Sequence, residues 1–305
     1  MTETNYFFSQ LHVNVARNAT DDFNLFHDSG KWRRINGNPF GGPIVLGFQL
    51  ESLIEGRIAA FRHKHAEQQL IVEHGLNFSN YEFSFATAVK PGQAVAVEIK
   101  ASKFKAGQSP TLSNRVIVKV DGGLALMGYK KETAIPLFLA DADPVAPADL
   151  RGMPDRSFLP RSELFLKRKF MTTSNAKNFL CGSLRDQSEY FDELQDKVNF
   201  PEMFPCALLS SALLEKAIKR QHDFERNPMV YQSHKISVDR SCLARLKSSD
   251  ALHILIKPSE NSAGHDFGGV NNTPLEYECY GLVGSGNIVF RAVIALLPLA
   301  LIINR

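Results

Sequence analysis

PFGGPIVLGFQLESLIEG, residues 39–56 of a 305-residue chain, passes from a glycine and proline cluster into apolar residues at helical spacing. The side chains that mark one helical face are Ile44, Phe48, Ile54 and Ile58. This spacing predicts one long apolar helix over residues 43–63. Runs rich in β-branched and aromatic residues then predict strands near 69–88, 93–105, 110–120 and 123–138.

The start of this helix carries residues that suit a hydrogen-bond donor site. Proline fits the first helical position, so Pro43 is expected there, and Gly41 and Gly42 permit unusual backbone angles before it. Gly47 has no side chain to screen its N–H from a ligand. Amides in the first helical turn lie in a positive field, which suits a carbonyl oxygen that gains negative charge. We therefore predict an oxyanion site at the Gly47 N–H.

The second half of the chain repeats this layout. Residues 90–100 align without gaps to residues 247–257, and residues 205–214 correspond to the helix that begins at Pro43. Four prolines between Ala140 and Arg161 stand in a segment with little periodicity, which is typical of a linker. The expected domains are 1–140, a linker at 141–161, and 162–305.

An acid/base pair precedes the first helix, on a segment expected to be irregular. Asp22 and His27 are five residues apart, and a loop can turn both side chains toward one point. Histidine titrates near neutral pH, and a carboxylate beside it can relay a proton. Taken alone, the pair favours a structural interpretation, with Asp22 capping a turn and His27 on the surface.

Two motifs resemble the MaoC-like, or (R)-specific, enoyl thioester hydratases of the hotdog fold. Asp22-Phe23-Asn24-Leu25-Phe26-His27 resembles the family signature Asp-x-Asn-Pro-x-His, with Leu25 in place of proline. Pro43-Ile44-Val45-Leu46-Gly47 resembles Pro-Ile-Val-His-Gly, with Leu46 in place of histidine. The order and separation of the two motifs also agree with that family.

The resemblance implies an α+β fold of two tandem hotdog units, each an antiparallel sheet wrapped around a long central helix. Two such units usually join their sheets edge to edge, so the chain is expected to form an intrachain pseudo-dimer. The implied activity is (R)-3-hydroxyacyl thioester dehydratase or trans-2-enoyl thioester hydratase, a hydro-lyase of fatty acid metabolism. Asp22 and His27 would be the catalytic pair, the Gly47 N–H would bind the thioester carbonyl, and Asn24 would support the loop.

No cofactor is expected beyond the coenzyme A or acyl-carrier phosphopantetheine that carries the substrate. Lys31, Arg33 and Arg34 follow the motif and are candidate contacts for the carrier's phosphates or for an acidic acyl carrier protein. Further positive charge comes from Arg62, Lys64, Lys103 and Lys105. The alternative interpretation of all these residues is a solvated surface.

The second copy is expected to be degenerate and to serve as structure or as a tunnel wall. Aligning Phe179 with Phe23 sets Asn178 opposite Asp22 and Ser183 opposite His27, and neither replacement transfers protons well at neutral pH. Leu209 or Ser210, rather than a glycine, then falls opposite Gly47. We therefore expect one active site per chain.

Two other functions remain open from the sequence. A hotdog thioesterase would polarise the same carbonyl but would activate water at the carbonyl carbon. A non-catalytic acyl-binding or assembly member of the family would carry Leu25 and Leu46 as signs of a decayed site.

Composition excludes other classes of function. The formal net charge of +3 gives no support to a nucleic-acid partner. The four cysteines lie in the second half without metal-ligand spacing or a secretory leader, so we expect no metal and a reduced, cytoplasmic protein. The apolar run 292–303 is too short to span a bilayer and contains Pro298, which favours a buried strand. A monomeric pseudo-dimer and a homodimer are both compatible with the sequence.

Overall fold

A computed structural model describes residues 5–141, 144, 149–262, 266–267, 274–284 and 286–303. In the first half the elements are β1 (Asn5–Phe7), α1 (Gln10–Thr20), the 3-10 helices η1 (Leu25–His27) and η2 (Lys31–Arg34), α2 (Gly47–Lys64), α3 (Gln68–Glu73), β2 (Phe78–Phe85), β3 (Ala94–Ile99), β4 (Lys103–Lys105), β5 (Thr111–Val120) and β6 (Gly123–Thr133).

The second half follows the same plan with additional short elements. These are β7 (Ser157–Phe158), β8 (Phe165–Met171), α4 (Thr173–Gly182), η3 (Gln187–Glu189), β9 (Phe191–Asp192), η4 (Glu193–Gln195), β10 (Lys197–Val198), α5 (Met203–Ala207), α6 (Leu209–Lys219), β11 (Met229–Asp239), α7 (Arg240–Leu243), β12 (Asp250–Pro258), η5 (Glu260–Ser262), β13 (Leu275–Val283), β14 (Asn287–Pro298) and α8 (Ala300–Ile303).

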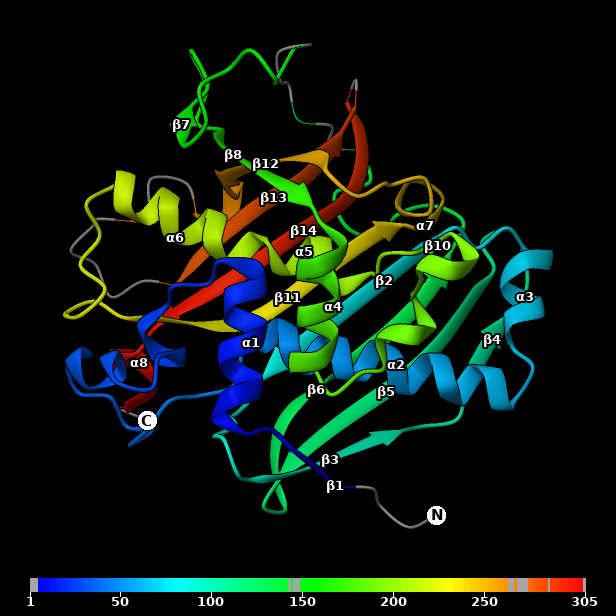
Figure 1. Cartoon of the computed structure of the whole chain (residues 1–305), viewed down its shortest axis with the longest axis horizontal. Coiled ribbons are helices and arrows are strands. Elements are labelled where there is room, and N and C mark those ends of the chain that lie inside the picture. Colours follow the sequence, from blue (N-terminus) through cyan, green and yellow to red (C-terminus); the bar gives the residue numbers. More distant parts are fainter. Residues whose placement is uncertain are drawn as a thin grey trace.

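One antiparallel sheet runs through both halves of the described chain, in the order β1-β3-β5-β6-β2-β11-β14-β13-β12-β8-β7, with β4 paired to β5. The halves meet where β2 pairs with β11, from Phe78 opposite Asp239 to Ser84 opposite Ser233. Outward from this seam the two halves follow one order, which places β6 with β14, β5 with β13, β3 with β12 and β1 with β8. The predicted tandem arrangement, with sheets joined edge to edge, is therefore confirmed (Figure 1).

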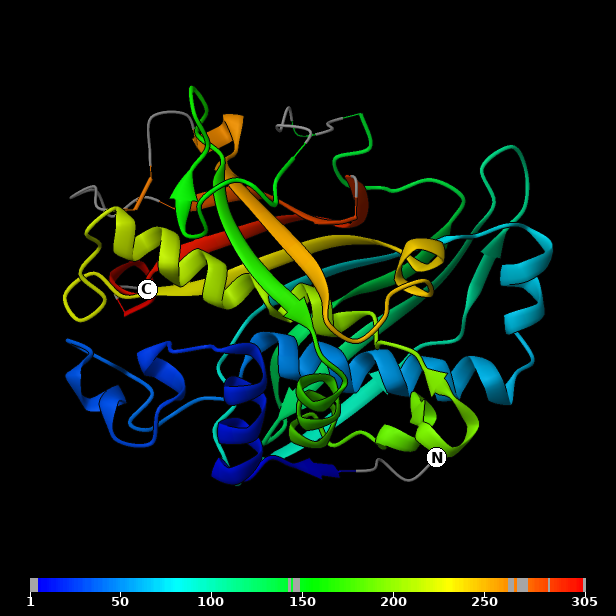
Figure 2. The ribbon, with the colours of Figure 1, turned by 45° about the horizontal axis from the view of Figure 1, so that its top comes forward.

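The central helices α2 and α6 lie on the same face of this sheet (Figures 1 and 2). Helix α2 buries Phe48, Leu53, Ile54 and Ile58, each at most 1% exposed. These side chains belong to one apolar cluster that also contains Leu213 of α6 and residues of both half-sheets. The core is thus continuous across the seam, which explains why the two halves pack as one body.

The first central helix starts four residues later than expected. Residues 43–46 are not helical, because the Ile44 N–H donates to the Phe26 carbonyl at 2.9 Å and the Val45 N–H donates to the Val89 carbonyl at 2.8 Å. Gly47, and not Pro43, is therefore the first helical residue.

The second central helix also departs from the prediction. It begins at Met203 rather than at Pro205, and it is divided into α5 and α6 at Leu208. Gly47 therefore corresponds to the region of Met203, not to Leu209 or Ser210.

Several predicted strands are shorter than their apolar runs. The run 69–88 contains helix α3, a turn at Gly75 with φ of 58°, and only then β2. The run 93–105 divides into β3 and β4, and the run 292–303 ends as a strand at Pro298. Within the expected linker, residues 157–158 pair with β8 as β7, whereas 142–143 and 145–148 lie outside the described residues. The domain boundaries stay a prediction.

Candidate functional site

The predicted acid/base pair lies where the chain leaves helix α1. Asp21 adopts a left-handed conformation with φ of 54°, and the Asp22 N–H donates back to the Arg17 carbonyl at 2.8 Å. This reversal directs the next residues into η1, which ends at His27. The side chains of Asp22 and His27 are 1% and 5% exposed, so both are withdrawn from bulk water.

The imidazole of His27 has a defined tautomer. Its Nδ1 lies 2.8 Å from the Ile44 carbonyl oxygen, and because a carbonyl only accepts, Nδ1 must carry the proton. Nε2 is left with a free lone pair, 3.8 Å from Asp22 Oδ2. That separation exceeds a direct hydrogen bond but allows one water molecule to contact both atoms.

Burial favours the neutral form of this histidine. Desolvation lowers the pKa of His27 below its ordinary value of 6.5, although the Asp22 carboxylate and the Ile44 carbonyl act in the opposite direction. The structure therefore holds a neutral imidazole, able to accept a proton at Nε2, beside a carboxylate.

Hydrogen bonds within the loop fix the orientation of the pair. Asp22 Oδ1 accepts the Asn24 N–H at 2.9 Å, and Asn24 Oδ1 accepts the Phe26 N–H at 3.2 Å. The ring of Phe26 packs edge-on against Phe40 at 5.7 Å. Asp22 thus caps a turn with one oxygen and faces His27 with the other. The Asn24 cap and the Phe26 contact hold the turn at Leu25, where the family motif has proline.

Gly47 begins α2 beside this pair. The Gln49 and Leu50 N–H groups donate to the Leu46 carbonyl at 3.1 and 3.2 Å, so the Gly47 N–H precedes the first intrahelical donors. A Cβ at Gly47 would lie 3.0 Å from the Phe85 ring and 3.5 Å from the Tyr231 ring. Glycine is needed here because the two aromatic rings approach the backbone closely.

A cavity of about 170 Å³ lies beside His27 and Gly47, and Asp22 is not among the residues that line it. His27, Asn24 and Gly47 line it on the first-half side. Most of the remaining wall is apolar and comes from both halves: Phe26, Phe40, Ile44, Val45, Leu50, Phe85, Val89, Leu213, Leu214, Phe224, Met229, Val230, Phe267 and Leu296. The cavity therefore suits a ligand with a polar head at His27 and an apolar tail.

Four polar residues of this wall were not predicted from the sequence as part of the site: Thr87, Ser210, His222 and Tyr231. Ser210 of α6 and Tyr231 of β11 line the cavity, and their hydroxyl oxygens are 2.8 Å apart. Ser210 was expected only as a replacement for Gly47 in the degenerate copy, and Tyr231 lies in a strand without a recognisable motif. These second-half residues meet His27 and Gly47 of the first half only because the two half-sheets are joined, and no local sequence pattern indicates that contact.

The degenerate copy differs from the predicted alignment. Residues 173–182 form helix α4, the counterpart of α1, because the Thr172 hydroxyl accepts the Asn175 N–H and caps the helix. Asn178 is exposed on this helix, and Ser183 is its C-terminal cap. Neither residue occupies the place of Asp22 or His27.

The true counterparts of the acid/base pair follow α4. The Arg185 N–H donates to the Leu180 carbonyl at 2.9 Å, as Asp22 does to Arg17, and η3 then matches η1. On this correspondence Arg185 replaces Asp22 and Glu189 replaces His27. The two form an ion pair at 2.8 Å, which cannot act as a neutral base.

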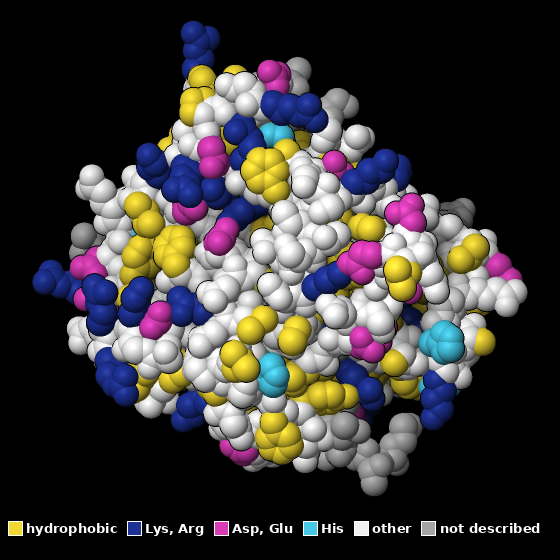
Figure 3. All heavy atoms as spheres, in the orientation of Figure 1, with side chains coloured by type: hydrophobic (Ala, Val, Ile, Leu, Met, Phe, Trp, Pro, Cys, Tyr) yellow, Lys and Arg dark blue, Asp and Glu magenta, His cyan; other side chains and the backbone are white. Residues whose placement is uncertain are grey.

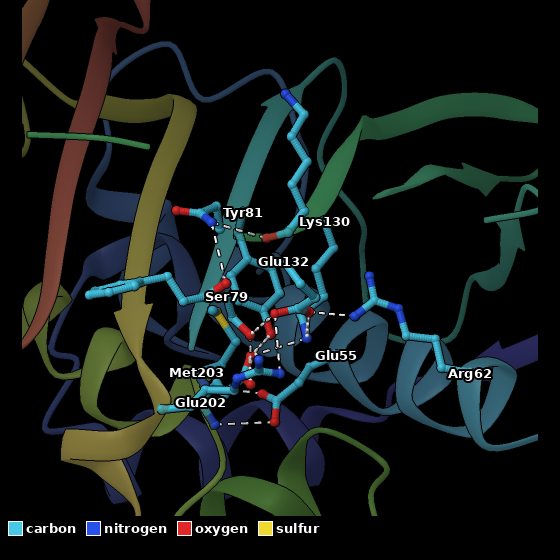
Figure 4. A network of polar contacts seen from close by, with 12 residues as sticks. Glu55, Arg62, Ser79, Tyr81, Lys130, Glu132, Glu202 and Met203 are labelled. Carbon is cyan, nitrogen blue, oxygen red and sulfur yellow. Dashed lines mark hydrogen bonds and ion pairs between the residues drawn. The ribbon is translucent and has the colours of Figure 1, made fainter. Parts of the chain in front are cut away.

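In the second half, side chains of the protein bind the N–H groups at the start of the central helix (Figure 4). The Glu55 carboxylate of α2 accepts the Glu202 and Met203 N–H groups at 3.1 and 3.0 Å, and the Tyr190 hydroxyl at 3.0 Å. Glu202 in turn contacts Lys130 at 3.2 Å and accepts a hydrogen bond from Ser79 at 2.8 Å. Charged side chains thus occupy the region that in the first half is a cavity.

The basic residues divide into two groups. Lys31, Arg33 and Arg34 are exposed on η2, and Figure 3 shows Lys and Arg side chains at the left edge of that face, where Figure 1 draws η2. Arg34 pairs with Glu225, and both line a second hollow of about 270 Å³. The two cavities share Asn24, Leu214, His222 and Phe224, so the second hollow lies next to the first.

The other predicted cations do not line either of these two cavities. Arg62 is buried and bonds to Glu132 and Asn114, which corrects its assignment to a charged surface. Lys64 ends α2, about 25 Å along the helix from Gly47. Lys103 and Lys105 lie on β4, beyond that same end of α2 (Figure 1). Asp28, next to His27 in the chain, forms an ion pair with Arg17 at 2.8 Å.

Across the described residues, no three His, Cys, Asp or Glu side chains are arranged to hold a metal ion. All four cysteines are unpaired thiols, of which only Cys181 is exposed. In this same part of the chain, no helix has the length and apolar character needed to cross a bilayer.

Neither a family model nor a curated protein matches this sequence. Solved structures do match its fold. A MaoC-like dehydratase shares 10% identity with a TM-score of 0.57, over 97% of this chain and 96% of its own. A conserved hypothetical protein from Mycobacterium tuberculosis, described as a double hotdog, shares 13% identity with a TM-score of 0.58, over 97% of this chain and 94% of its own. A putative MaoC domain dehydratase from Chloroflexus aurantiacus shares 11% identity with a TM-score of 0.57, over 97% of this chain and 93% of its own. At these identities the likeness establishes the fold, which is the double hotdog predicted from the motifs.

Proposed function

We propose that this protein is a trans-2-enoyl thioester hydratase, or (R)-3-hydroxyacyl thioester dehydratase in the reverse direction. The observation that carries the proposal is the Asp22–His27 pair, with His27 Nε2 free and 3.8 Å from the carboxylate, at a cavity that Gly47 also lines. A base and a backbone donor thus line one apolar pocket, and the Asp22 carboxylate lies 3.8 Å from that base.

The geometry supports a simple course for the hydration. A water molecule between Asp22 Oδ2 and His27 Nε2 gives a proton to the pair as its oxygen adds to C3. The electron pair of the double bond moves toward the carbonyl, and the Gly47 N–H stabilises the resulting enolate oxygen. The pair then returns a proton to C2, so hydration adds one water molecule and needs no metal or organic cofactor.

The acyl chain would occupy the apolar part of the cavity, toward Leu213 and Leu296. The carrier would then leave through the mouth beside η2. Lys31, Arg33 and Arg34 would meet the phosphates of coenzyme A or an acidic acyl carrier protein there. This assignment supports a role in fatty acid metabolism.

One assay tests the proposed function against its alternatives. The protein is incubated with crotonyl and longer enoyl thioesters of coenzyme A and of acyl carrier protein, and both conjugated double bond and free thiol are followed. Loss of conjugation without thiol release is expected. Thiol release would identify a thioesterase. Silence in both signals across chain lengths and carriers would refute an enzyme of either kind.

The pH dependence of kcat/KM should report the neutral histidine. A protonated Nε2 cannot accept a proton, so activity is lost as the pH falls through the pKa of His27. Because burial lowers this pKa below 6.5, the midpoint of the acid limb should lie below pH 6.5. Steady-state rates between pH 4.5 and 8 measure it, and a midpoint above pH 7 would contradict the assignment.

Gly47→Ala should impair the donor site. The new methyl group would meet the Phe85 ring at 3.0 Å, so the helix start or the ring must move. A displacement on the order of 1 Å is expected to lower kcat/KM about 10- to 100-fold. Gly42→Ala is the matched control, because no atom lies within 4 Å of its added Cβ and activity should stay near the wild type. Equal activity of both variants would contradict the expected displacement of the donor at position 47.

A further inference from the structure

We propose that Ser210 and Tyr231 form a hydroxyl pair that binds an oxygen atom of the acyl group, and that the second half thereby completes the site in the first. The inference rests on the proposed function and deepens it. The oxygen is either the thioester carbonyl or the hydroxyl at C3. No motif of the family resemblance covers these two residues.

Tyr231 lies between the two parts of the proposed site. Its ring is 3.5 Å from the Cβ position of Gly47, which places it alongside the helix start. Its hydroxyl bonds to Ser210 at 2.8 Å, and both residues line the cavity that His27 lines. The tyrosine therefore borders the space that a substrate bound at Gly47 and His27 would fill.

The pair retains hydrogen-bonding capacity after its own bond is formed. Two hydroxyls carry two protons, and only one is used between them, so one O–H remains to donate. Burial, followed by the charge of Asp22, raises the pKa of Tyr231, so its hydroxyl stays protonated at neutral pH. The wall from Leu213, Met229 and Val230 is apolar, and Asn24 and His27 are the polar side chains on the first-half side of the same cavity. A ligand oxygen is the partner that this free donor fits.

Aromatic contacts hold the tyrosine in place. Its ring packs edge-on against Phe48 at 5.9 Å and against His234 at 4.4 Å. His234 is itself fully buried and bonds to Glu51 of α2 at 2.9 Å. A side chain fixed in this way loses little entropy when it binds, which favours a role in recognition.

The second half shows which kind of atom binds between a tyrosine hydroxyl and the amides of a helix start. There a tyrosine hydroxyl, from Tyr190, and the amides of a helix start bind the oxygens of one carboxylate, from Glu55. In the first half a tyrosine hydroxyl and the Gly47 amide face an open cavity instead. We infer that a substrate oxygen takes the position that a protein oxygen fills in the second half.

Binding measurements test this inference. Tyr231→Phe and Ser210→Ala are each added to the inactive Asp22→Asn protein, and calorimetry measures the Kd of hexanoyl-CoA and of (R)-3-hydroxyhexanoyl-CoA. Loss of one neutral hydrogen bond should weaken binding about 3- to 10-fold. Weakening of both ligands assigns the pair to the carbonyl, and weakening of the hydroxylated ligand alone assigns it to the C3 oxygen. Unchanged binding of both ligands would overturn the inference.

Matched substitutions control for general damage. Ser211→Ala removes a buried hydroxyl next to Ser210 that donates to the Leu208 carbonyl and does not line the cavity. Tyr280→Phe removes a buried hydroxyl that bonds to Glu278, away from the cavity. Both should leave the two Kd values within about twofold, below the effect of one lost hydrogen bond.

The inference and the proposed function fail in different ways. If the otherwise wild-type protein does not hydrate enoyl thioesters but binding still depends on Tyr231, the function is wrong and the binding site stands. If the protein hydrates them and Tyr231→Phe changes neither Kd nor KM, the inference is wrong and the function stands.

Discussion

Asp22→Asn is expected to lower the kcat of enoyl thioester hydration by about 10²- to 10⁴-fold, the usual contribution of a positioned acid/base group. The reason is chemical and not architectural. An amide oxygen at Oδ1 can still accept the Asn24 N–H, so the turn is kept. The position of Oδ2, which faces His27, would lose its charge and its ability to take a proton. Circular dichroism and the urea midpoint should therefore stay near the wild-type values while turnover is lost.

His27→Ala should reduce turnover by a similar factor, since it removes the base itself. The size of these losses is judged against carboxylate and loop changes outside the pair. Asp28→Asn alters a carboxylate six residues away that pairs with Arg17, and Asn178→Ala alters an exposed position of α4. Both should retain turnover within about twofold, because neither touches the cavity. A loss in these controls equal to that of Asp22→Asn would refute the one-site model.

The candidate site residues that could be predicted from the sequence lie close together in the chain. The spacing of Asp22 and His27 is local, and the helix that follows them has a strong apolar period, so both could be inferred from single segments. The gapless repeat of residues 90–100 and 247–257 could also be recognised, and it places β3 and β12 at equivalent positions. Together with the family resemblance of the two motifs, these features predicted the fold.

Among the predictions that were wrong are the counterparts of Asp22 and His27 in the second half and the start of the first central helix. Phe179 was matched to Phe23, although Thr172 three residues before Asn175 is a typical helix N-cap. That signal would have shifted the counterpart of Asp22 to Arg185. At Pro43 the composition favoured an immediate helix start, but two backbone bonds to residues 26 and 89 keep this segment extended. Such long-range bonds cannot be read from local propensity.

Contacts between the halves were also beyond the reach of the sequence. Tyr231 meets Gly47 across 184 positions in the chain, and Glu55 meets Met203 across 148. Each half places side chains against the other half's helix start, but with opposite results. Glu55 binds the amides at the helix start of the second half, whereas Ser210 and Tyr231 line the cavity beside Gly47 in the first half. This asymmetry, in which one helix start is closed and the other borders a cavity, appears only when the sheets are joined.

The buried charges beside the closed region should make Glu132 one of the most sensitive positions for stability. Glu132 is fully buried and contacts three cations: Lys130 at 2.9 Å, Arg240 at 3.2 Å, and Arg62. The Ser79 hydroxyl, which also contacts Glu202, lies 2.7 Å from a carboxylate oxygen of Glu132. Burial alone would raise the pKa of Glu132, but Lys130, Arg62 and Arg240 outweigh it and hold this pKa well below its usual range. The carboxylate is therefore the common counter-ion of the cluster.

Glu132→Ala should lower the free energy of unfolding by about 3–5 kcal/mol, because it leaves buried cations without their partner. Urea unfolding at pH 7 measures the loss. Glu82→Ala, which removes a 41% exposed carboxylate paired with Lys131, should cost about 1 kcal/mol or less. Since the folded pKa of Glu132 is depressed, its contribution is complete above the unfolded pKa of about 4.3 and is lost as the pH falls toward the folded value. The difference between wild type and Glu132→Ala should therefore shrink below pH 4, and a difference under about 1 kcal/mol at pH 7 would show that the cations find other partners.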